Sequence, residues 1–262
     1  MRNNTFNILF LGDIIGSVGR NLLERELNII KEEYNIDFVG ANVENLANGF
    51  GLNENLYQEM EGMGINIMTS GNHIWDRKEI IEFIPQFQLL LRPANYPLGT
   101  PGVGVKTFYF NKLKISFVNL LGRVFMPIVD CPFRKFNEIF SDISDNIIIV
   151  DFHAEATSEK NAFCHYVDGR ASAVLGTHTH VQTNDDRRFP LGTYYISDVG
   201  MCGSLDSVIG MEKEGSIKKF LTSMPTKFEV EKSGRRLING VVLKIDKENK
   251  SIAEFIKIRK IY

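Results

Sequence analysis

The first 70 residues alternate between short apolar, β-branched segments and longer segments with the periodicity of amphipathic helices. This pattern predicts strands at 6–11, 38–43 and 65–69, with helices at 19–33 and 53–63 between them. A strand, a helix and a second strand in this order form a βαβ unit, in which parallel strands are covered by the connecting helices. The alternation therefore predicts a parallel β-sheet with helices packed on it.

Beyond residue 100 the pattern changes. Two apolar segments, 105–110 and 113–120, flank the turn-like dipeptide Asn111-Lys112, which predicts a hairpin and thus an antiparallel pair. Further strands are expected at 146–151, 171–176, 193–196, 240–245 and 252–259, and further helices at 133–140, 157–167 and 210–222. Strands of both kinds are most easily buried as two sheets packed face to face. We expect an α/β fold, a four-layer α/β/β/α sandwich of two mixed sheets flanked by helices.

Composition excludes several classes of protein. The 262 residues hold 30 Lys and Arg against 32 Asp and Glu, so no global positive field draws the chain to nucleic acid or anionic lipid. Apolar runs such as 8–11 are far shorter than the roughly 20 residues that span a bilayer, and we expect no membrane partner. The first apolar segment runs directly into Asp13 without a small-residue cleavage site, so we expect a strand there and no signal peptide.

Cysteine usage and the lack of internal divisions add two expectations. Cys131, Cys164 and Cys202 are an odd number at wide spacing, which favours reduced thiols and a cytoplasmic location. The sequence has no repeat, no low-complexity tract and no long linker. We therefore expect residues 1–262 to form a single domain.

Nearly every predicted strand ends in a polar residue of a type that binds metal ions. These residues are, in chain order, Asp13, Glu44, Asn45, Asn72, His73, His153, Glu155, His178 and His180. In an open α/β sheet the carboxyl ends of parallel strands share one edge, where ligands bind. Four of the five histidines in the chain lie in these motifs, which concentrates metal and proton chemistry at one predicted edge. We therefore predict a metal site there.

Most of these motifs also have a structural interpretation when taken alone. Asp13 can cap a helix, Glu44-Asn45 can form a turn, and a lone histidine such as His153 is usually structural. The pair His178 and His180 is more specific, because alternate side chains of an extended segment lie on one side. Residues 12–19 read GxxxGxxG instead of the GxGxxG of a dinucleotide-binding loop, which disfavours a nicotinamide-binding module. His165, Cys164 and Cys202 lie outside every motif, and we assign them to structure.

In order and spacing, the set resembles the calcineurin-like metallophosphoesterases, whose motifs are GD, a second acidic strand end, GNH, a lone His and GHxH. Here they read Gly12-Asp13, Glu44-Asn45, Gly71-Asn72-His73, His153 and Gly176-Thr177-His178-Thr179-His180. Two positions depart from the broad superfamily: Ile15 stands where a second ligand usually follows the first motif, and Glu44 replaces an Asp. Both departures resemble one bacterial branch, the 2′,3′-cyclic-nucleotide phosphodiesterases, whose flanking sequences also match at 42–45, 72–76, 92–97, 153–160 and 178–183. The resemblance covers roughly residues 5–260.

The resemblance implies two metal ions per subunit that share a bridging hydroxide and a bridging carboxylate, Glu44. The other ligands are divided between the ions, with Asp13, Asn45 and His180 at the first and Asn72, His153 and His178 at the second. Asn45 then replaces the histidine that Ile15 cannot supply. Imidazole, carboxylate and amide donors without thiolate favour iron or manganese, with zinc as a further candidate. In the family pattern His73 adjoins a ligand without being one, and we assign it as the proton donor to the leaving ribose oxygen, or as a charge stabiliser there.

We therefore expect a metal-dependent phosphodiesterase that hydrolyses cyclic nucleotides, and the resemblance implies 2′,3′-cyclic nucleoside monophosphates as substrates. Two alternatives stay open: a phosphoesterase acting on another nucleotide, an RNA end or a phosphoprotein, and a nucleotide-binding regulatory protein that needs no turnover. RNA ends are a source of 2′,3′-cyclic phosphates, although no basic stripe supports extended RNA binding. The expected partner is a small nucleotide, and a homo-oligomer is also open.

Overall fold

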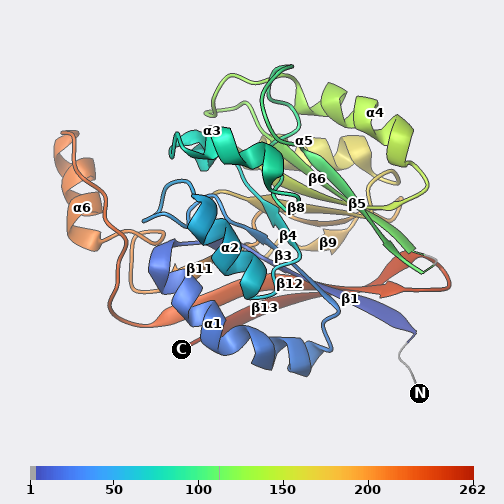
Figure 1. Cartoon of the computed structure of the whole chain (residues 1–262), viewed down its shortest axis with the longest axis horizontal. Coiled ribbons are helices and arrows are strands. Elements are labelled where there is room, and N and C mark those ends of the chain that lie inside the picture. Colours follow the sequence, from blue (N-terminus) through green and yellow to red (C-terminus); the bar gives the residue numbers. More distant parts are fainter. Residues whose placement is uncertain (1–3, 112) are drawn as a thin grey trace.

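Two β-sheets stacked face to face form the centre of the molecule (Figure 1). The computed structural model describes residues 4–111 and 113–262. The first sheet contains β1 (Thr5–Leu11), β2 (Asp13–Ile14), β3 (Phe38–Asn42), β4 (Ile67–Thr69), β11 (Met201–Ser204), β12 (Arg236–Asp246) and β13 (Ser251–Ile261). The second contains β5 (Val105–Phe110), β6 (Leu113–Leu121), β7 (Ile147–His153), β8 (Ala173–Thr177), β9 (Arg187–Arg188) and β10 (Tyr194–Ile196).

Both sheets are mixed. The first has the order β2-β11-β12-β1-β3-β4, with β13 paired to β12, and the second has the order β5-β6-β7-β8-β10-β9. Strand β1 is parallel to β3 but antiparallel to β12, and β6 is parallel to β7 but antiparallel to β5. The expected hairpin is present, and of its two turn residues Asn111 has a positive φ of 53° while Lys112 lies outside the described residues.

Helices cover the outer face of each sheet (Figure 1). Their bounds are α1 (Gly16–Tyr34), α2 (Glu54–Gly62), α3 (Ile80–Phe83), α4 (Pro132–Ile143), α5 (Thr157–Val167) and α6 (Lys213–Thr222), with short 3-10 turns η1 (Asn72–Trp75) and η2 (Ile84–Gln86). Helices α1 and α2 pack on the first sheet, and α4 and α5 pack on the second. The expected four-layer sandwich is confirmed.

Alternating side chains of each central strand explain why the layers hold together. In β1, Leu9 and Leu11 enter the core beneath α1 and α2, whereas Ile8 and Phe10 point into the core between the sheets. There they share one cluster with residues of the second sheet such as Phe117. Because both faces of these strands are buried, each strand appears in the sequence as a continuous apolar run.

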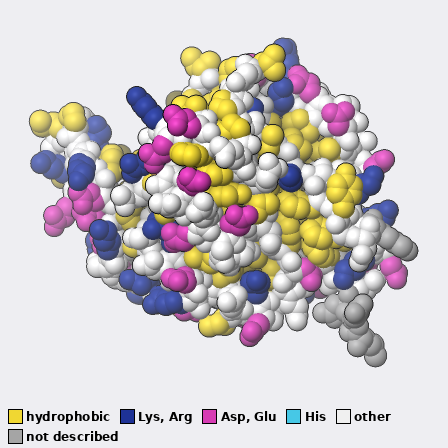
Figure 2. All heavy atoms as spheres, in the orientation of Figure 1, with side chains coloured by type: hydrophobic (Ala, Val, Ile, Leu, Met, Phe, Trp, Pro, Cys, Tyr) yellow, Lys and Arg dark blue, Asp and Glu magenta, His cyan; other side chains and the backbone are white. Residues whose placement is uncertain are grey.

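The segment that contains α6 lies apart from the four layers (Figure 1). Residues 212–229, which we call the arm, leave and rejoin the body at an antiparallel bridge between Met211 and Val230. The predicted helix at 210–222 begins only at Lys213, because Gly210 has a φ of 100° and Met211 pairs in this bridge. Figure 2 shows hydrophobic side chains at the tip of the arm, and basic and acidic side chains mixed over the rest of this face. None of the described helices is both long and apolar enough to cross a bilayer.

Candidate metal centre

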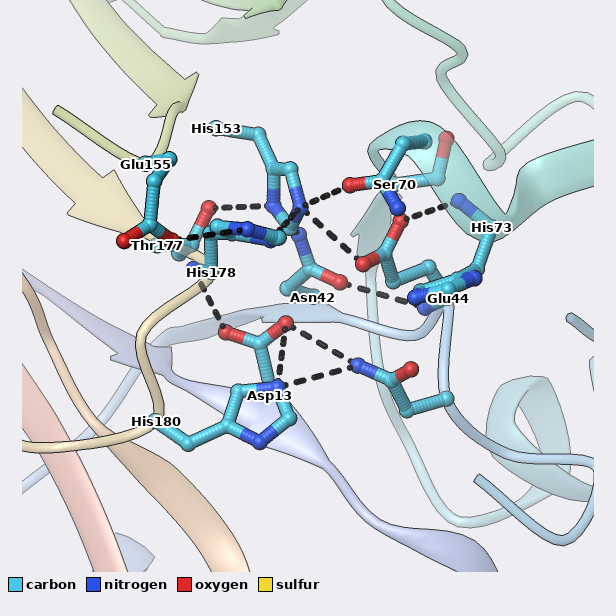
Figure 3. Close-up of polar contacts among 12 residues, drawn as sticks. Asp13, Asn42, Glu44, Ser70, His73, His153, Glu155, Thr177, His178 and His180 are labelled. Atoms are coloured by element: carbon cyan, nitrogen blue, oxygen red, sulfur yellow. Dashed lines mark hydrogen bonds and ion pairs between the residues drawn. The ribbon is translucent and has the colours of Figure 1, made fainter. Parts of the chain in front are cut away.

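The predicted ligands meet where the carboxyl ends of strands from both sheets lie together (Figure 3). Asp13 lies in β2, Glu44 and Asn45 follow β3, Asn72 and His73 begin η1 after β4, His153 ends β7, and His178 and His180 follow β8. The sequence led us to expect a single sheet edge. The site lies instead at the junction of two sheets, because β7 and β8 belong to the second sheet and the others to the first.

Asp13, Asn45 and His180 form one contact group. The Asn45 side-chain amide donates to Asp13 Oδ1 at 3.2 Å, and His180 Nε2 lies 3.3 Å from Asn45 Nδ2 and 3.6 Å from Asp13 Oδ1. The other imidazole nitrogen, His180 Nδ1, lies 2.8 Å from the carbonyl oxygen of Ile209. That carbonyl orients the ring so that Nε2 faces the side chains of Asp13 and Asn45.

Asn72, His153 and His178 form a second contact group beside the first. His153 Nε2 lies 3.1 Å from Asn72 Oδ1 and 3.1 Å from His178 Nδ1. Glu44 joins this group through Oε1, which is 3.0 Å from His153 Nε2. The backbone N–H of His178 donates to Asp13 Oδ2 at 3.3 Å and thereby connects the two groups.

Two histidines of the β8 loop have backbone conformations that few non-glycine residues adopt. His178 has a φ of 106° and His180 a φ of 64°, and such conformations persist only where the surroundings stabilise them. Both rings point into the site (Figure 3). Alternation along an extended segment was expected to place both rings on one side. The two residues lie instead beyond the end of β8, and each ring joins a different contact group.

Close packing of the chain brings the backbones of two motifs near the site. A Cβ atom on Gly71 would lie 2.1 Å from Cδ2 of the His153 ring, and one on Gly12 would lie 1.9 Å from the carbonyl oxygen of Gly200. Only glycine fits at either position. The glycines of these motifs are therefore required for the close approach of neighbouring segments.

Three residues that the sequence did not single out orient His153. The Thr177 hydroxyl donates to Asp151 Oδ1 at 2.6 Å and lies 2.9 Å from His153 Nδ1. Because that hydroxyl hydrogen is used, its oxygen accepts from His153 Nδ1–H and leaves Nε2 to face the site. Asn42 donates to Asp151 Oδ2 at 3.2 Å, which joins the two sheets. The only signal in the sequence is that Asp151 precedes His153 by two residues, on the same face of β7.

A buried ion pair supports the loop that carries His178 and His180. Lys160 Nζ lies 3.1 Å from Asp198 Oδ2 and donates to the carbonyl oxygen of Thr177 at 2.8 Å. The same Asp198 oxygen accepts from the backbone N–H of Thr179 at 2.9 Å. The residues on both sides of His178 are therefore bonded to one charged pair.

Charges in the site are paired. Burial disfavours the charged form of His180, but the Asp13 carboxylate outweighs it and raises the pKa of His180 to about 9. Burial likewise opposes the charges of Glu44 and His153, yet their mutual attraction lowers the pKa of Glu44 and raises that of His153. Burial, together with the charge of His153, lowers the pKa of His178 to about 3. At neutral pH the imidazolium of His180 thus faces the Asp13 carboxylate, and the contact between His153 and Glu44 favours the charged form of each.

The arrangement fits a bound cation. Glu44 is fully buried, and among the described residues its Oε1 has the 3.0 Å contact with His153 Nε2 but no hydrogen bond of acceptable geometry. Ligand atoms of Glu44, His153 and His178 lie within 4.8 Å of one another. Asn72 Oδ1, His178 Nδ1 and Glu44 Oε1 all present lone pairs to His153 Nε2. One hydrogen on that nitrogen cannot bond to all three atoms, whereas a metal ion can bind several of them. The donors are nitrogen and oxygen atoms, which suit iron, manganese or zinc.

His73 lies at the wall of the cavity that opens onto these groups. Its backbone N–H donates to Glu44 Oε2 at 2.9 Å, and Asp76 Oδ2 lies 2.8 Å from His73 Nδ1. The Phe50 ring contacts the imidazole edge to face, with centroids 5.0 Å apart. These contacts orient the ring and leave Nε2 as the nitrogen available to a ligand.

Comparison with known proteins identifies the family. A family model described as YmdB-like protein matches residues 9–258. The chain belongs to the YmdB-like family. One curated relative is a 2′,3′-cyclic-nucleotide 2′-phosphodiesterase of Bacillus subtilis (strain 168). It is 46% identical to this chain over 253 residues, which cover 96% of each chain.

Solved structures agree with this membership. A crystal structure described as a novel phosphatase from Mycoplasma pneumoniae has a TM-score of 0.93 at 39% identity and covers 100% of this chain and 95% of that chain. A putative 5′-nucleotidase from Staphylococcus aureus, solved with α-ketoglutarate, has a TM-score of 0.62 at 14% identity, over 96% of this chain and 54% of that chain. This last likeness shows the fold alone. The expected family, fold and enzyme class are confirmed.

Proposed function

We propose that the chain, acting as one domain over residues 1–262, is a dimetal phosphodiesterase that hydrolyses 2′,3′-cyclic nucleoside monophosphates. The observation that carries the proposal is the pair of adjoining contact groups, one around Asp13 and one around His153, joined at 3.3 Å by His178 N–H and Asp13 Oδ2. Two such groups side by side suit two neighbouring ions. The name of the Bacillus subtilis relative supports the choice of substrate.

Each side chain has a role in this proposal. Asp13, Asn45 and His180 would hold one ion and Asn72, His153 and His178 the other, with Glu44 shared between them. When bound, the ions would neutralise charge on the phosphate and make water acidic enough to supply a nucleophile near neutral pH. We propose iron or manganese for the ions. The described cysteines are all free, in keeping with the cytoplasmic location that we propose.

His73 would donate a proton to the ribose oxygen that leaves. It lines the same cavity as Glu44, His178 and His180, so its Nε2 can reach a diester held there. Proton donation by a positioned side chain accelerates reactions by roughly 10²–10⁴-fold. The relative's name specifies the 2′ ester, and cleavage of that bond leaves a nucleoside 3′-phosphate.

The experiment is hydrolysis by metal-stripped protein reloaded with Mn²⁺, Fe²⁺ or Zn²⁺. The panel holds 2′,3′-cyclic AMP, 3′,5′-cyclic AMP, AMP and a phosphopeptide, with chromatography of the products. We expect 2′,3′-cyclic AMP to be converted to 3′-AMP faster than any other substrate is consumed. Preference for another ester would replace the substrate assignment, and nucleotide binding without any turnover would favour the regulatory alternative.

The role of His73 has its own test. His73→Ala is expected to retain its metal content and to lose turnover by roughly 10²–10⁴-fold. His165→Ala is the matched control, because His165 lies on α5 with its ring against Phe189 and outside the site. Turnover of His73→Ala equal to that of the control would remove His73 from the mechanism, and loss of metal would make it a ligand instead.

A further inference from the structure

The lining of the cavity above the candidate metal centre is partly polar and partly apolar. Its volume is about 400 Å³, within the size range of small-molecule sites. The polar part includes Glu44, His73 and His180. The apolar part includes Phe50, which lies against His73, residues Val208, Ile209 and Met211, and the arm residues Phe220 and Phe228. A ligand that fills the cavity therefore needs a polar part and an apolar part.

The two arm rings contribute little to the folded core. The Phe220 side chain is 83% exposed and that of Phe228 is 38% exposed. The base of the arm is held by backbone hydrogen bonds, from Glu212 N–H to the carbonyl of Glu229 at 2.8 Å and from Glu231 N–H to the carbonyl of Gly210 at 3.0 Å. Large apolar side chains exposed beside a polar site are typical of ligand-binding grooves.

The charges that line the cavity restrict the ligand further. None of the fifteen described residues that line it is Lys or Arg, whereas two, Glu44 and Glu155, carry carboxylates. Apart from the imidazole rings of the site, only the cations of the metal centre would therefore offset negative charge on a ligand. A phosphodiester with one negative charge suits this lining better than a phosphomonoester, a diphosphate or a triphosphate.

We propose that Phe220 and Phe228 bind the nucleobase of the substrate by stacking, with Phe50 as a further aromatic wall of the same cavity, and that they select nucleoside over non-nucleoside cyclic phosphates. This inference rests on the proposed function and adds the source of substrate specificity. A nucleobase is flat, neutral and largely apolar on its faces, which matches the phenylalanine rings in the cavity lining. Stacking of bases on aromatic side chains also tolerates differences among bases, so purine and pyrimidine nucleotides are both expected to bind.

The first test is equilibrium binding of adenosine, which has the base but no phosphate to be hydrolysed. Stacking on one aromatic ring changes affinity by roughly 5- to 150-fold, and we expect Phe220→Ala and Phe228→Ala each to weaken adenosine binding about 10-fold in an NMR titration. Leu221→Ala is the matched control, because Leu221 follows Phe220 in α6, is about as exposed as Phe220 and does not line the cavity.

The second test compares two substrates with the same five-membered cyclic diester. For 2′,3′-cyclic AMP, the arm variants are expected to raise KM about 10-fold and to leave kcat within about twofold. For glycerol 1,2-cyclic phosphate, which has no base, both constants are expected to stay at the wild-type values.

The outcomes separate this inference from the proposed function. Adenosine binding that weakens in both arm variants and not in Leu221→Ala supports the stacking site, whether or not cyclic nucleotides are hydrolysed. The stacking site is overturned if adenosine does not bind the wild-type protein, or if it binds the arm variants as tightly as the wild type. It is also overturned if the arm variants change the KM of both cyclic substrates equally. Failure of the metal-loaded wild-type protein to hydrolyse either diester overturns only the proposed function.

Discussion

Replacement of Lys160 by Met is expected to destabilise the protein more than any surface substitution, because it breaks a buried ion pair. The side chains of Lys160 and Asp198 are 2% and 1% exposed. Methionine fills nearly the same volume as lysine, so the change removes the charge and the hydrogen bonds and leaves little cavity. Within the described part of the chain, the Asp198 carboxylate would then keep only its bonds from the N–H groups of Thr179 and Gly200, at 2.9 and 2.8 Å.

The expected loss of folding free energy follows from the Asp198 charge, which stays buried without its partner. An unpaired buried charge costs roughly 3–5 kcal/mol of folding free energy, which for a domain of this size lowers Tm by roughly 6–20 °C. The substitution should also disturb the metal centre, because Lys160 Nζ donates to the carbonyl oxygen of Thr177, directly before the predicted ligand His178. We therefore expect weaker Mn²⁺ binding in addition to lower stability.

Thermal unfolding of the metal-free protein, followed by circular dichroism, measures the first effect, and calorimetric titration with Mn²⁺ measures the second. Lys227→Met is the matched control, because Lys227 pairs with Glu229 on the surface, where its side chain is 84% exposed. Exposed pairs contribute about 0–1 kcal/mol, so the control should unfold near the wild-type temperature. A Lys160→Met protein that unfolds within 2 °C of the control, by this estimate, would refute the reasoning.

Three further predictions concern metal binding. Glu44→Ala should lose most of its metal and its activity, and two ions per chain found by elemental analysis would contradict the shared-ligand role. Because Asp13 raises the pKa of His180 to about 9, the metal-free protein holds that proton at pH 7, and metal binding should release it. The release should fade as the pH rises through about 9; titration heats at pH 7 that are equal in buffers of different ionisation enthalpy would argue against it. Gly71→Ala should displace His153 and lower the bound metal by about half, since its Cβ would lie 2.1 Å from the ring, and a wild-type metal content would count against this.

Much of the scaffold was predictable because its physical causes are local. Buried parallel strands require apolar runs, and their connections require helices, so the segments around Ile8 and Phe38 indicated β1 and β3 correctly. The polar residues that follow these runs were recognisable as a group, because carboxyl ends of parallel strands meet. Strands β2, β9 and β11 and helix α3 were missed. Strands β2 and β9 have two residues each and α3 has four, while β11, Met201–Ser204, contains a glycine and no β-branched side chain.

The parts that could not be predicted depend on tertiary placement. Nothing in the local sequence shows that His178 and His180 adopt positive φ values, since the bonds that stabilise this loop come from Lys160 and Asp198, on separate segments of the chain. Nor does the sequence show that two sheets divide the ligands between them. The alternation within a strand orders residues on one sheet, whereas the distance between sheets is set by their packing.

The position of the arm could not be predicted from the sequence either. Helical periodicity at 213–222 favours burial of its apolar residues, and a helix was correctly expected there. Yet Ile217, Phe220 and Leu221 are exposed, because the bridge between Met211 and Val230 directs the helix away from the sheets. An apolar residue of a helix belongs to the core by default, and only its position beside a polar cavity gives Phe220 a different role. The chemistry of the strand ends is therefore encoded locally, while selection of the substrate would depend on where the arm is placed.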